Sequence, residues 1–409
     1  MARLILNPLR FLGTAFSIAI LLLYSSSLAW AKADDIDQQQ PNPLELTEPD
    51  PLLPKLPVER PLTRGELKQL REALDELDVQ AKAQLAAGNP EKAFEIWYRE
   101  IRLRRVAGGN LEEVETLGRV GAIAWDGNHK PQVQLITKRL ATIQQQAQTE
   151  GSLDQDLLIA LGQAYQQVRV PGQALAIYDQ ILADLRQSGD NEAIEATLKT
   201  MAGLHMTWFD YPKAIATYEE LLSLAQQQGD RVQEFVYLQE IAYIYDQAKE
   251  PENALRMKQK LAASYPPNDI RLPALKIAIA SDYEALEQLD EASQTYQEAY
   301  TLAFALQQYA YAGEALQKLA KLYRSHNQPE FALQVYNVLL QVEQQSYNYY
   351  GLMDAYDQIG QINLELKNYN QALTAFEKGL EFARFLKYQE TYFATQIEQV
   401  NQQSQKNQQ

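Results

Sequence analysis

The 409-residue chain contains no cysteine and only three histidines. Without cysteine it has no disulfide, no thiolate-ligated zinc, no iron–sulfur cluster and no thiol catalysis. Basic residues are also scarce: 37 Lys and Arg stand against 53 Asp and Glu, which gives a formal net charge of -16. Nucleic-acid binding needs a basic stripe that faces the phosphates, so this balance argues against a nucleic-acid partner.

The motifs of common catalytic and ligand sites are missing as well. The sequence has no Gly-rich phosphate loop, no G-x-S-x-G, no H-E-x-x-H and no EF-hand spacing. Gly108-Gly109-Asn110 is interpreted as a turn between helices. We therefore expect a protein that is not an enzyme, with no cofactor and no metal.

Residues 1–31 have the layout of a secretory signal. Two arginines and no acid precede an apolar run at 11–24, and small residues then lead to Ala29-Trp30-Ala31. As a helix the run would span about 21 Å, which is short of a ~30 Å bilayer core. Cleavage after Ala31 is therefore favoured over an uncleaved membrane anchor, and an anchor of this kind would be the only membrane attachment.

The segment 32–62 differs in composition from the rest. Seven of the 17 prolines fall between Pro41 and Pro61, and each fixes φ and removes a backbone donor. We expect a disordered, extended spacer, with a Pro-rich ligand for another domain as the alternative. Residues 401–409, NQQSQKNQQ, are expected to form a disordered tail.

The body of the chain, residues 63–400, is a helical repeat that opens on a capping box at Thr63 and Glu66. An alanine is followed four residues later by an aromatic ring in most units. These pairs are Ala93/Trp97, Ala174/Tyr178, Ala214/Tyr218, Ala292/Tyr296, Ala332/Tyr336 and Ala372/Phe376, whereas Ala254/Lys258 lacks the ring. A small residue precedes each alanine by twelve positions. The units begin near 74, 114, 155, 195, 235, 273, 313 and 353.

This pattern resembles the tetratricopeptide repeat family over residues 74–389. Small residues let two antiparallel helices approach closely, and the rings fill the space beside them. The resemblance implies an all-α fold, a right-handed α-solenoid of about eight helix hairpins, with a C-terminal capping helix after 389. The period near 40, rather than the usual 34, indicates longer helices.

In this family the first helices of the repeats commonly line a groove that binds peptides or helices. By resemblance, the groove residues here are Trp125, Gln163, Gln166, Lys199, Met206, Gln239, Tyr243, Asp246, Gln317, Lys321 and Arg324. The Lys-x-x-x-Asn of the chaperone-binding carboxylate clamp is absent from the first repeats. Lys321 and Arg324 form a basic spot suited to a carboxylate, or else a solvated helix face.

Three tyrosines close together in the sequence, Tyr347, Tyr349 and Tyr350, form a second candidate interface before the last repeat. We expect a scaffold or assembly factor that binds a protein or peptide outside the cytoplasm. The alternatives are a self-associating envelope spacer and a domain that senses a small ligand. The sequence is also similar to exported cyanobacterial members of the family, which implies the periplasm or the thylakoid lumen.

Overall fold

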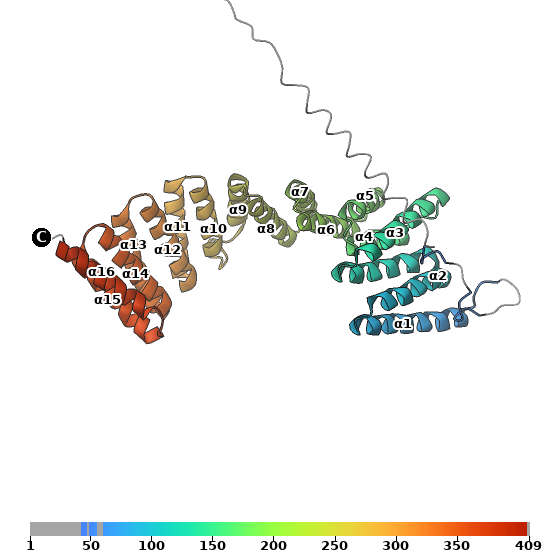
Figure 1. Cartoon of the computed structure of the whole chain (residues 1–409). Coiled ribbons are helices and arrows are strands. Elements are labelled where there is room, and N and C mark those ends of the chain that lie inside the picture. The colour runs from blue at the N-terminus through green and yellow to red at the C-terminus, as the bar shows by residue number, and fades with distance from the viewer. Residues whose placement is uncertain (1–41, 47–48, 55–59, 407–409) are drawn as a thin grey trace, which may run out of the picture. The chain divides into compact units, whose positions relative to one another are not determined.

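The computed structural model describes residues 42–46, 49–54 and 60–406. Over these residues the chain forms sixteen helices and no strand. In order (Figure 1), they are α1 (Arg64–Ala86), α2 (Pro90–Asp126), α3 (Lys130–Glu150), α4 (Gln155–Gln167), α5 (Pro171–Ser188), α6 (Asn191–Thr207), α7 (Tyr211–Gln228), α8 (Arg231–Gln247), α9 (Pro251–Ser264), α10 (Leu272–Ala285), α11 (Leu289–Ala305), α12 (Tyr309–Ser325), α13 (Pro329–Gln345), α14 (Tyr349–Glu365), α15 (Tyr369–Leu386) and α16 (Glu390–Lys406). The fold is an all-α solenoid, as predicted. The expected export signal, residues 1–31, lies outside the described residues.

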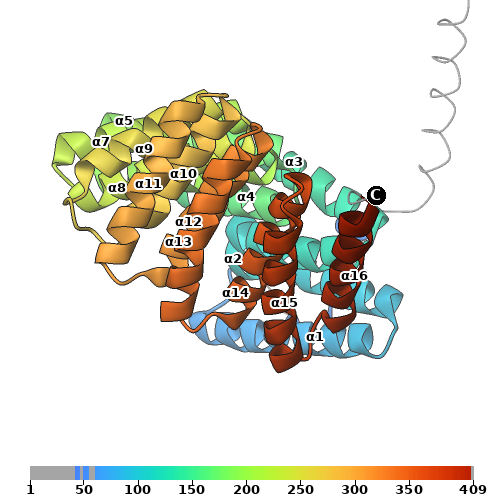
Figure 2. The same cartoon turned by 90° about the vertical axis from the view of Figure 1, so that its left-hand side faces the viewer.

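The helices belong to two compact units, residues 1–184 and 185–409, with the division inside α5. In the first unit α2 packs against α1, α3 and α4. In the second unit each helix from α7 to α15 packs against the helix before it and the helix after it. Figure 2 shows α14, α15 and α16 side by side within that unit. Each unit is thus a stack of helix hairpins that bury their apolar faces against their neighbours.

Every hairpin has the same backbone turn between its two helices. One turn residue adopts the left-handed conformation, with φ between 57° and 80°, in each case. These residues are Gly88, Asn128, Arg169, Phe209, Lys249, Glu287, Asn327 and Lys367. Each lies fourteen positions after one of the repeat starts inferred from the sequence. Seven of the eight are not glycine, although this conformation costs an L-residue roughly 1–2 kcal/mol.

Helix α2 joins two hairpins. Its helical geometry breaks at Gly108 and Gly109, where Gly109 has φ 66° and ψ -151°. The part before the break is the second helix of the first hairpin, and the part after it is the first helix of the second hairpin. The glycines therefore provide the turn that the sequence indicates, and the helix changes direction there.

The core explains why small residues and aromatic rings recur in register. A Cβ atom added to Gly360 would lie 2.5 Å from the Phe376 ring, so the ring occupies the space that a side chain would need. A Cβ on Gly162 would lie 3.2 Å from Tyr178 in the same way. Ala280 and Tyr296 occupy the equivalent positions in another hairpin and are both fully buried. The repeat pattern thus records direct contacts between the two helices of a hairpin.

Lys258 occupies the aromatic position of the fifth hairpin, and it is buried. Its Nζ donates to both carboxylate oxygens of Asp282, at 2.8 and 2.9 Å, and to Asp246 at 2.8 Å. Asp282 lies on α10 and is itself buried. Burial raises the pKa of Asp282, although the hydrogen bond and the charge of Lys258 oppose that shift. In this hairpin an ion pair replaces the ring of its sister repeats.

Part of the proline-rich segment packs against the first hairpin. We call residues 42–46 and 49–54 the N-terminal strap. Leu44 of the strap is fully buried, and Arg105 of α2 donates to its carbonyl at 2.9 Å. Arg99 holds Asp50 through two hydrogen bonds of 2.7 and 2.8 Å. The predicted disordered spacer is therefore wrong for these residues, because arginines along one face of α2 bind them.

A buried ion pair also fixes the second hairpin. Glu113 of α2 is fully buried and accepts hydrogen bonds from Arg139 of α3, at 2.7 and 3.1 Å, and from Arg105. Arg139 is 8% exposed. Since each charge has a partner of opposite sign, the pair can persist in the core, where a lone charge would be strongly unfavourable.

The stack ends on α16, which packs against α15 through the buried residues Phe393 and Val400. This helix is the cap that the sequence predicts. It continues to Lys406, so residues 401–406 are helical and the predicted disordered tail is wrong for them. The helix extends because Gln and Lys are good helix formers once a nucleus exists.

Candidate functional site

The last hairpins bring several predicted residues onto one surface, which we call the α14 surface and define as the facing sides of α12, α14 and α16. Gln317, Lys321 and Arg324 lie on α12. Arg324 donates to Gln358 at 2.7 Å and forms an ion pair with Glu365, both on α14. Arg324, one of the two residues of the expected basic spot, is therefore paired from within the chain.

Two carboxylates lie beside that spot. Asp354 and Asp357 are on α14, and burial raises the pKa of both. For Asp354 the charge of Lys321 opposes the shift, and for Asp357 a hydrogen bond of 2.9 Å from the Tyr392 hydroxyl opposes it. Gln361 donates to Tyr392 and to Gln396 of α16, at 3.1 Å each. These contacts join α14 to the cap.

An exposed aromatic cluster adjoins the α14 surface. It consists of Tyr349, Tyr350, Phe382, Phe385 and Tyr388. Tyr349 packs on Phe382 and Phe385, with ring centroids 6.2 and 5.1 Å apart, and Tyr350 packs on Tyr388 at 6.1 Å. Tyr350, Phe385 and Tyr388 are 54%, 67% and 51% exposed. Large rings left in water in this way are typical of a protein interface.

The cluster differs in part from the one expected. The structure joins Tyr349 and Tyr350 to rings at the end of α15, which sequence reasoning missed. Tyr347 is 76% exposed and sits in the turn before α14 with φ 56°. The missed rings could have been found from the repeat, because an antiparallel hairpin places the end of α15 beside the start of α14.

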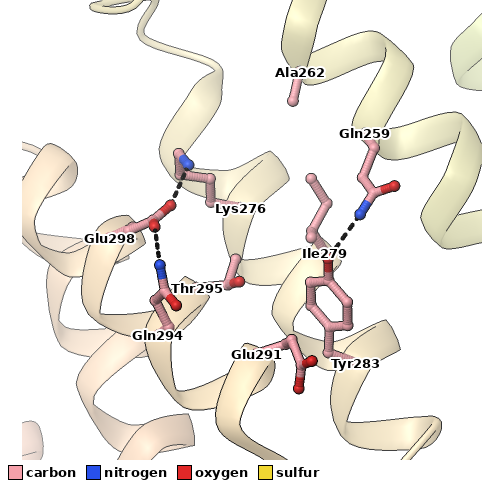
Figure 3. Close-up of a pocket in the computed structure, with 9 residues that line it drawn as sticks. All are labelled: Gln259, Ala262, Lys276, Ile279, Tyr283, Glu291, Gln294, Thr295 and Glu298. Atoms are coloured by element: carbon pink, nitrogen blue, oxygen red, sulfur yellow. Dashed lines mark hydrogen bonds and ion pairs between the residues drawn. The ribbon is translucent and has the colours of Figure 1, made fainter. Parts of the chain in front are cut away.

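A polar hollow of about 310 Å³ lies in the second unit between α9, α10 and α11 (Figure 3). Lys276 pairs with Glu298 at 2.7 Å and lowers the pKa of that carboxyl through the hydrogen bond. Gln259 donates to the Tyr283 hydroxyl at 2.7 Å. The hollow exists because Ala262 stands where the neighbouring hairpins carry Leu222 and Tyr300. Its main polar groups satisfy one another, and no nucleophile paired with a base lines it.

The other predicted groove residues lie elsewhere in each unit. Trp125 is 45% exposed and borders an apolar hollow of about 290 Å³ with Ala124 and Val133, all in the first unit. Gln163 is exposed on α4, and Gln166 accepts a 3.4 Å hydrogen bond from Tyr178.

In the second unit, the remaining predicted residues are split between packing and surface roles. Lys199 pairs with Glu195 at 2.6 Å, and Met206 packs against the core around α7 to α9. Gln239 donates to Tyr265, and Asp246 accepts from Lys258. Tyr243 is 51% exposed.

Within the described ranges, no helix is both long and apolar enough to cross a membrane. The same residues contain no group of three or more His, Asp or Glu side chains placed to hold a metal ion.

A model of the tetratricopeptide repeat family matches residues 354–385, which span most of α14 and α15. A search of curated proteins gave no significant match. Solved structures with similar stacking include BtubC (BKLC) from P. vanneervenii, at 17% identity over 53% of this chain and 92% of that chain, with a TM-score of 0.38. Aspartyl phosphate phosphatase F from Bacillus subtilis has 17% identity over 70% and 78%, with a TM-score of 0.40.

Proposed function

We propose that this protein is a non-catalytic scaffold that binds a protein or peptide partner at the α14 surface. The match of residues 354–385 to a tetratricopeptide repeat model and the stacked helix hairpins support this proposal. The observation that carries the proposal is the exposed aromatic cluster. Rigid rings with polar tips give contact area at a low entropic cost, and buried cores of interfaces are enriched in them. The cluster adjoins a polar surface that can supply hydrogen bonds at its edge.

The polar side chains of the hollow in Figure 3 pair mainly with one another, and on the α14 surface Arg324 pairs with Glu365. Binding to such a surface needs shape and charge complementarity and no reactive group.

We extend the proposal to location: the protein acts outside the cytoplasm, in the periplasm or the thylakoid lumen, as a scaffold or assembly factor. This part is supported by the sequence of residues 1–31 alone, with its apolar run and small-residue cleavage pattern. Fractionation of cells that express the tagged chain, with mass spectrometry of its N-terminus, tests both export and cleavage. A chain that keeps Met1 and stays in the cytoplasm contradicts it.

Site-specific photo-crosslinking tests the binding role. A benzophenone amino acid is placed at position 350 in the full chain, and for comparison at Glu377, an exposed residue of α15. We expect position 350 to capture a defined partner in cells and position 377 to capture none. The replacement Phe385→Ala should lower the yield at position 350. If neither position captures a protein, the proposal is wrong.

Self-association is the competing outcome of the same experiment. A crosslink from position 350 to a second copy of the chain would indicate a self-associating spacer. Analytical ultracentrifugation of the purified chain then distinguishes the two, because only a spacer forms larger species as its own concentration rises.

A further inference from the structure

The face of α14 that looks between α12 and α16 carries a regular line of side chains. Tyr350, Asp354, Asp357 and Gln361 are spaced by three and four residues, so they share one side of the helix. Tyr350 is the exposed ring at the start of this line. Any extended segment that lies along α14 would meet the ring first and the two carboxylates next.

The carboxylates on this line are incompletely balanced by the chain's own cations. Arg324 is committed to Glu365 and Gln358. Asp357 accepts hydrogen bonds from neutral groups, the Tyr392 hydroxyl and the Gln358 amide. Asp354 accepts no hydrogen bond from any residue in the described part of the chain, and Lys321 is the cation near it. Lys321 is therefore the cation near Asp354, and Asp357 feels only the charge of Arg324, which is itself paired with Glu365.

The rings beside these carboxylates complete a site for a cation. Tyr350 and Tyr388 contact each other edge to face and keep about half of their surfaces exposed. The face of a phenol ring attracts an ammonium or guanidinium, and a carboxylate next to it strengthens the attraction. The whole chain carries a net charge of -16, which steers cationic segments towards it.

We propose that the partner segment bound at the α14 surface is basic: a Lys or Arg side chain docks between Tyr350 and the carboxylates Asp354 and Asp357, and an apolar residue beside it packs on the aromatic cluster. This inference rests on the proposed binding function and specifies the chemistry of the partner. Lys321 and Arg324 would then stabilise the positions of Asp354 and Asp357, and they would not bind a carboxylate of the partner.

Fluorescence anisotropy with the full chain tests the inference. The probe is a short labelled peptide in which Lys, Arg and Phe are separated by Gly and Ser, and the comparison peptide has Glu in place of Lys and Arg. We expect the basic peptide to bind, with an affinity that falls as salt is added, and the acidic peptide not to bind. Equal binding of both peptides, or binding of neither, overturns the inference.

Paired variants separate this site from non-specific attraction to an acidic protein. The double variant D354N/D357N should weaken binding of the basic peptide roughly tenfold. The matched double variant E330Q/E377Q removes two charges from exposed positions on α13 and α15 and should leave binding unchanged. Y350A should weaken binding several-fold. If D354N/D357N binds as tightly as E330Q/E377Q, the site is wrong, provided that circular dichroism shows both variants folded.

The crosslinking experiment keeps the two proposals apart. A partner captured at position 350 through a segment without Lys or Arg would overturn the basic-segment inference and leave the scaffold function intact. Failure to capture any partner, together with loss of peptide binding, would overturn both.

Discussion

The buried ion pair of the fifth hairpin gives a stability prediction with a definite pH dependence. Replacing Lys258 by methionine keeps most of the side-chain volume and removes the charge. Asp282 then stays in the core without its two 2.8–2.9 Å hydrogen bonds from Nζ. Breaking one side of a buried pair costs about 3–5 kcal/mol of unfolding free energy. We expect about 3 kcal/mol near pH 7, because Asp246, the other partner of Lys258, is partly exposed.

The cost should shrink in acid. Burial already raises the pKa of Asp282 in the native chain, and loss of Lys258 raises it further. When the pKa of a carboxyl is higher in the folded than in the unfolded state, its protonation stabilises the folded state. This stabilisation is complete at a pH below the unfolded-state pKa and is lost as the pH rises through the folded-state pKa. The penalty of K258M should therefore be smaller near pH 4.5 than near pH 7, by at least about 1 kcal/mol.

Urea unfolding followed by circular dichroism at the two pH values measures both quantities. The control is Lys260→Met on the same helix, whose side chain is exposed; it should change stability by no more than about 0.5 kcal/mol. A K258M penalty equal to that of K260M, or one that does not vary with pH, would refute the reasoning. The double variant K258M/D282L should recover most of the loss, since apolar residues can replace a buried ion pair.

Three further stability predictions concern other contacts, each measured as the urea midpoint of the full chain. G360L should destabilise by about 1–3 kcal/mol because the ring facing Gly360 occupies the space, whereas G203L should not, because Gly203 has open space around it. L44A should release the N-terminal strap and open it to protease, since fully buried Leu44 anchors it, at about 2 kcal/mol or more; an unchanged cleavage rate would contradict this. E113Q should cost about 3 kcal/mol by leaving Arg139 without its counter-charge, and a stability equal to the wild type would show that the pair is not needed.

The sequence predicts the hairpins well because the packing inside each one is local. A small residue, a ring and a turn lie within about thirty positions of one another, so their contacts leave a periodic trace. The first helix often carries a second ring three residues after the small residue, as at Tyr165, Tyr283 and Tyr323. Asn363 stands at this position in the last hairpin, where it is buried and donates to the Ile359 carbonyl at 2.9 Å. The repeat determines which position faces the core, and different residue types at that position find different packing or hydrogen-bond partners.

Contacts between segments that are far apart in the sequence produce no periodic sequence pattern of this kind. The N-terminal strap is held by the buried Leu44 side chain, by the Asp50 carboxylate and by the Leu44 carbonyl. The arginines that bind it lie 49 to 61 residues away in the sequence, so no local pattern marks the contact. The aromatic cluster combines α14 with the end of α15, which a linear reading of Tyr347, Tyr349 and Tyr350 cannot reveal. The pairing of Arg324 in the expected basic spot could not be predicted, because its partners Gln358 and Glu365 lie on the first helix of the next hairpin.

The common turn of the eight hairpins separates architecture from surface chemistry. Its backbone is left-handed whether the residue is Asn128, Phe209 or Lys367, so the stack imposes the conformation and the side chain does not choose it. Phe209 is 74% exposed at such a tip. The left-handed turn residues are therefore regularly spaced surface positions along each unit. A fluorophore, an affinity tag or a short inserted loop can be attached there without disturbing the packed helices.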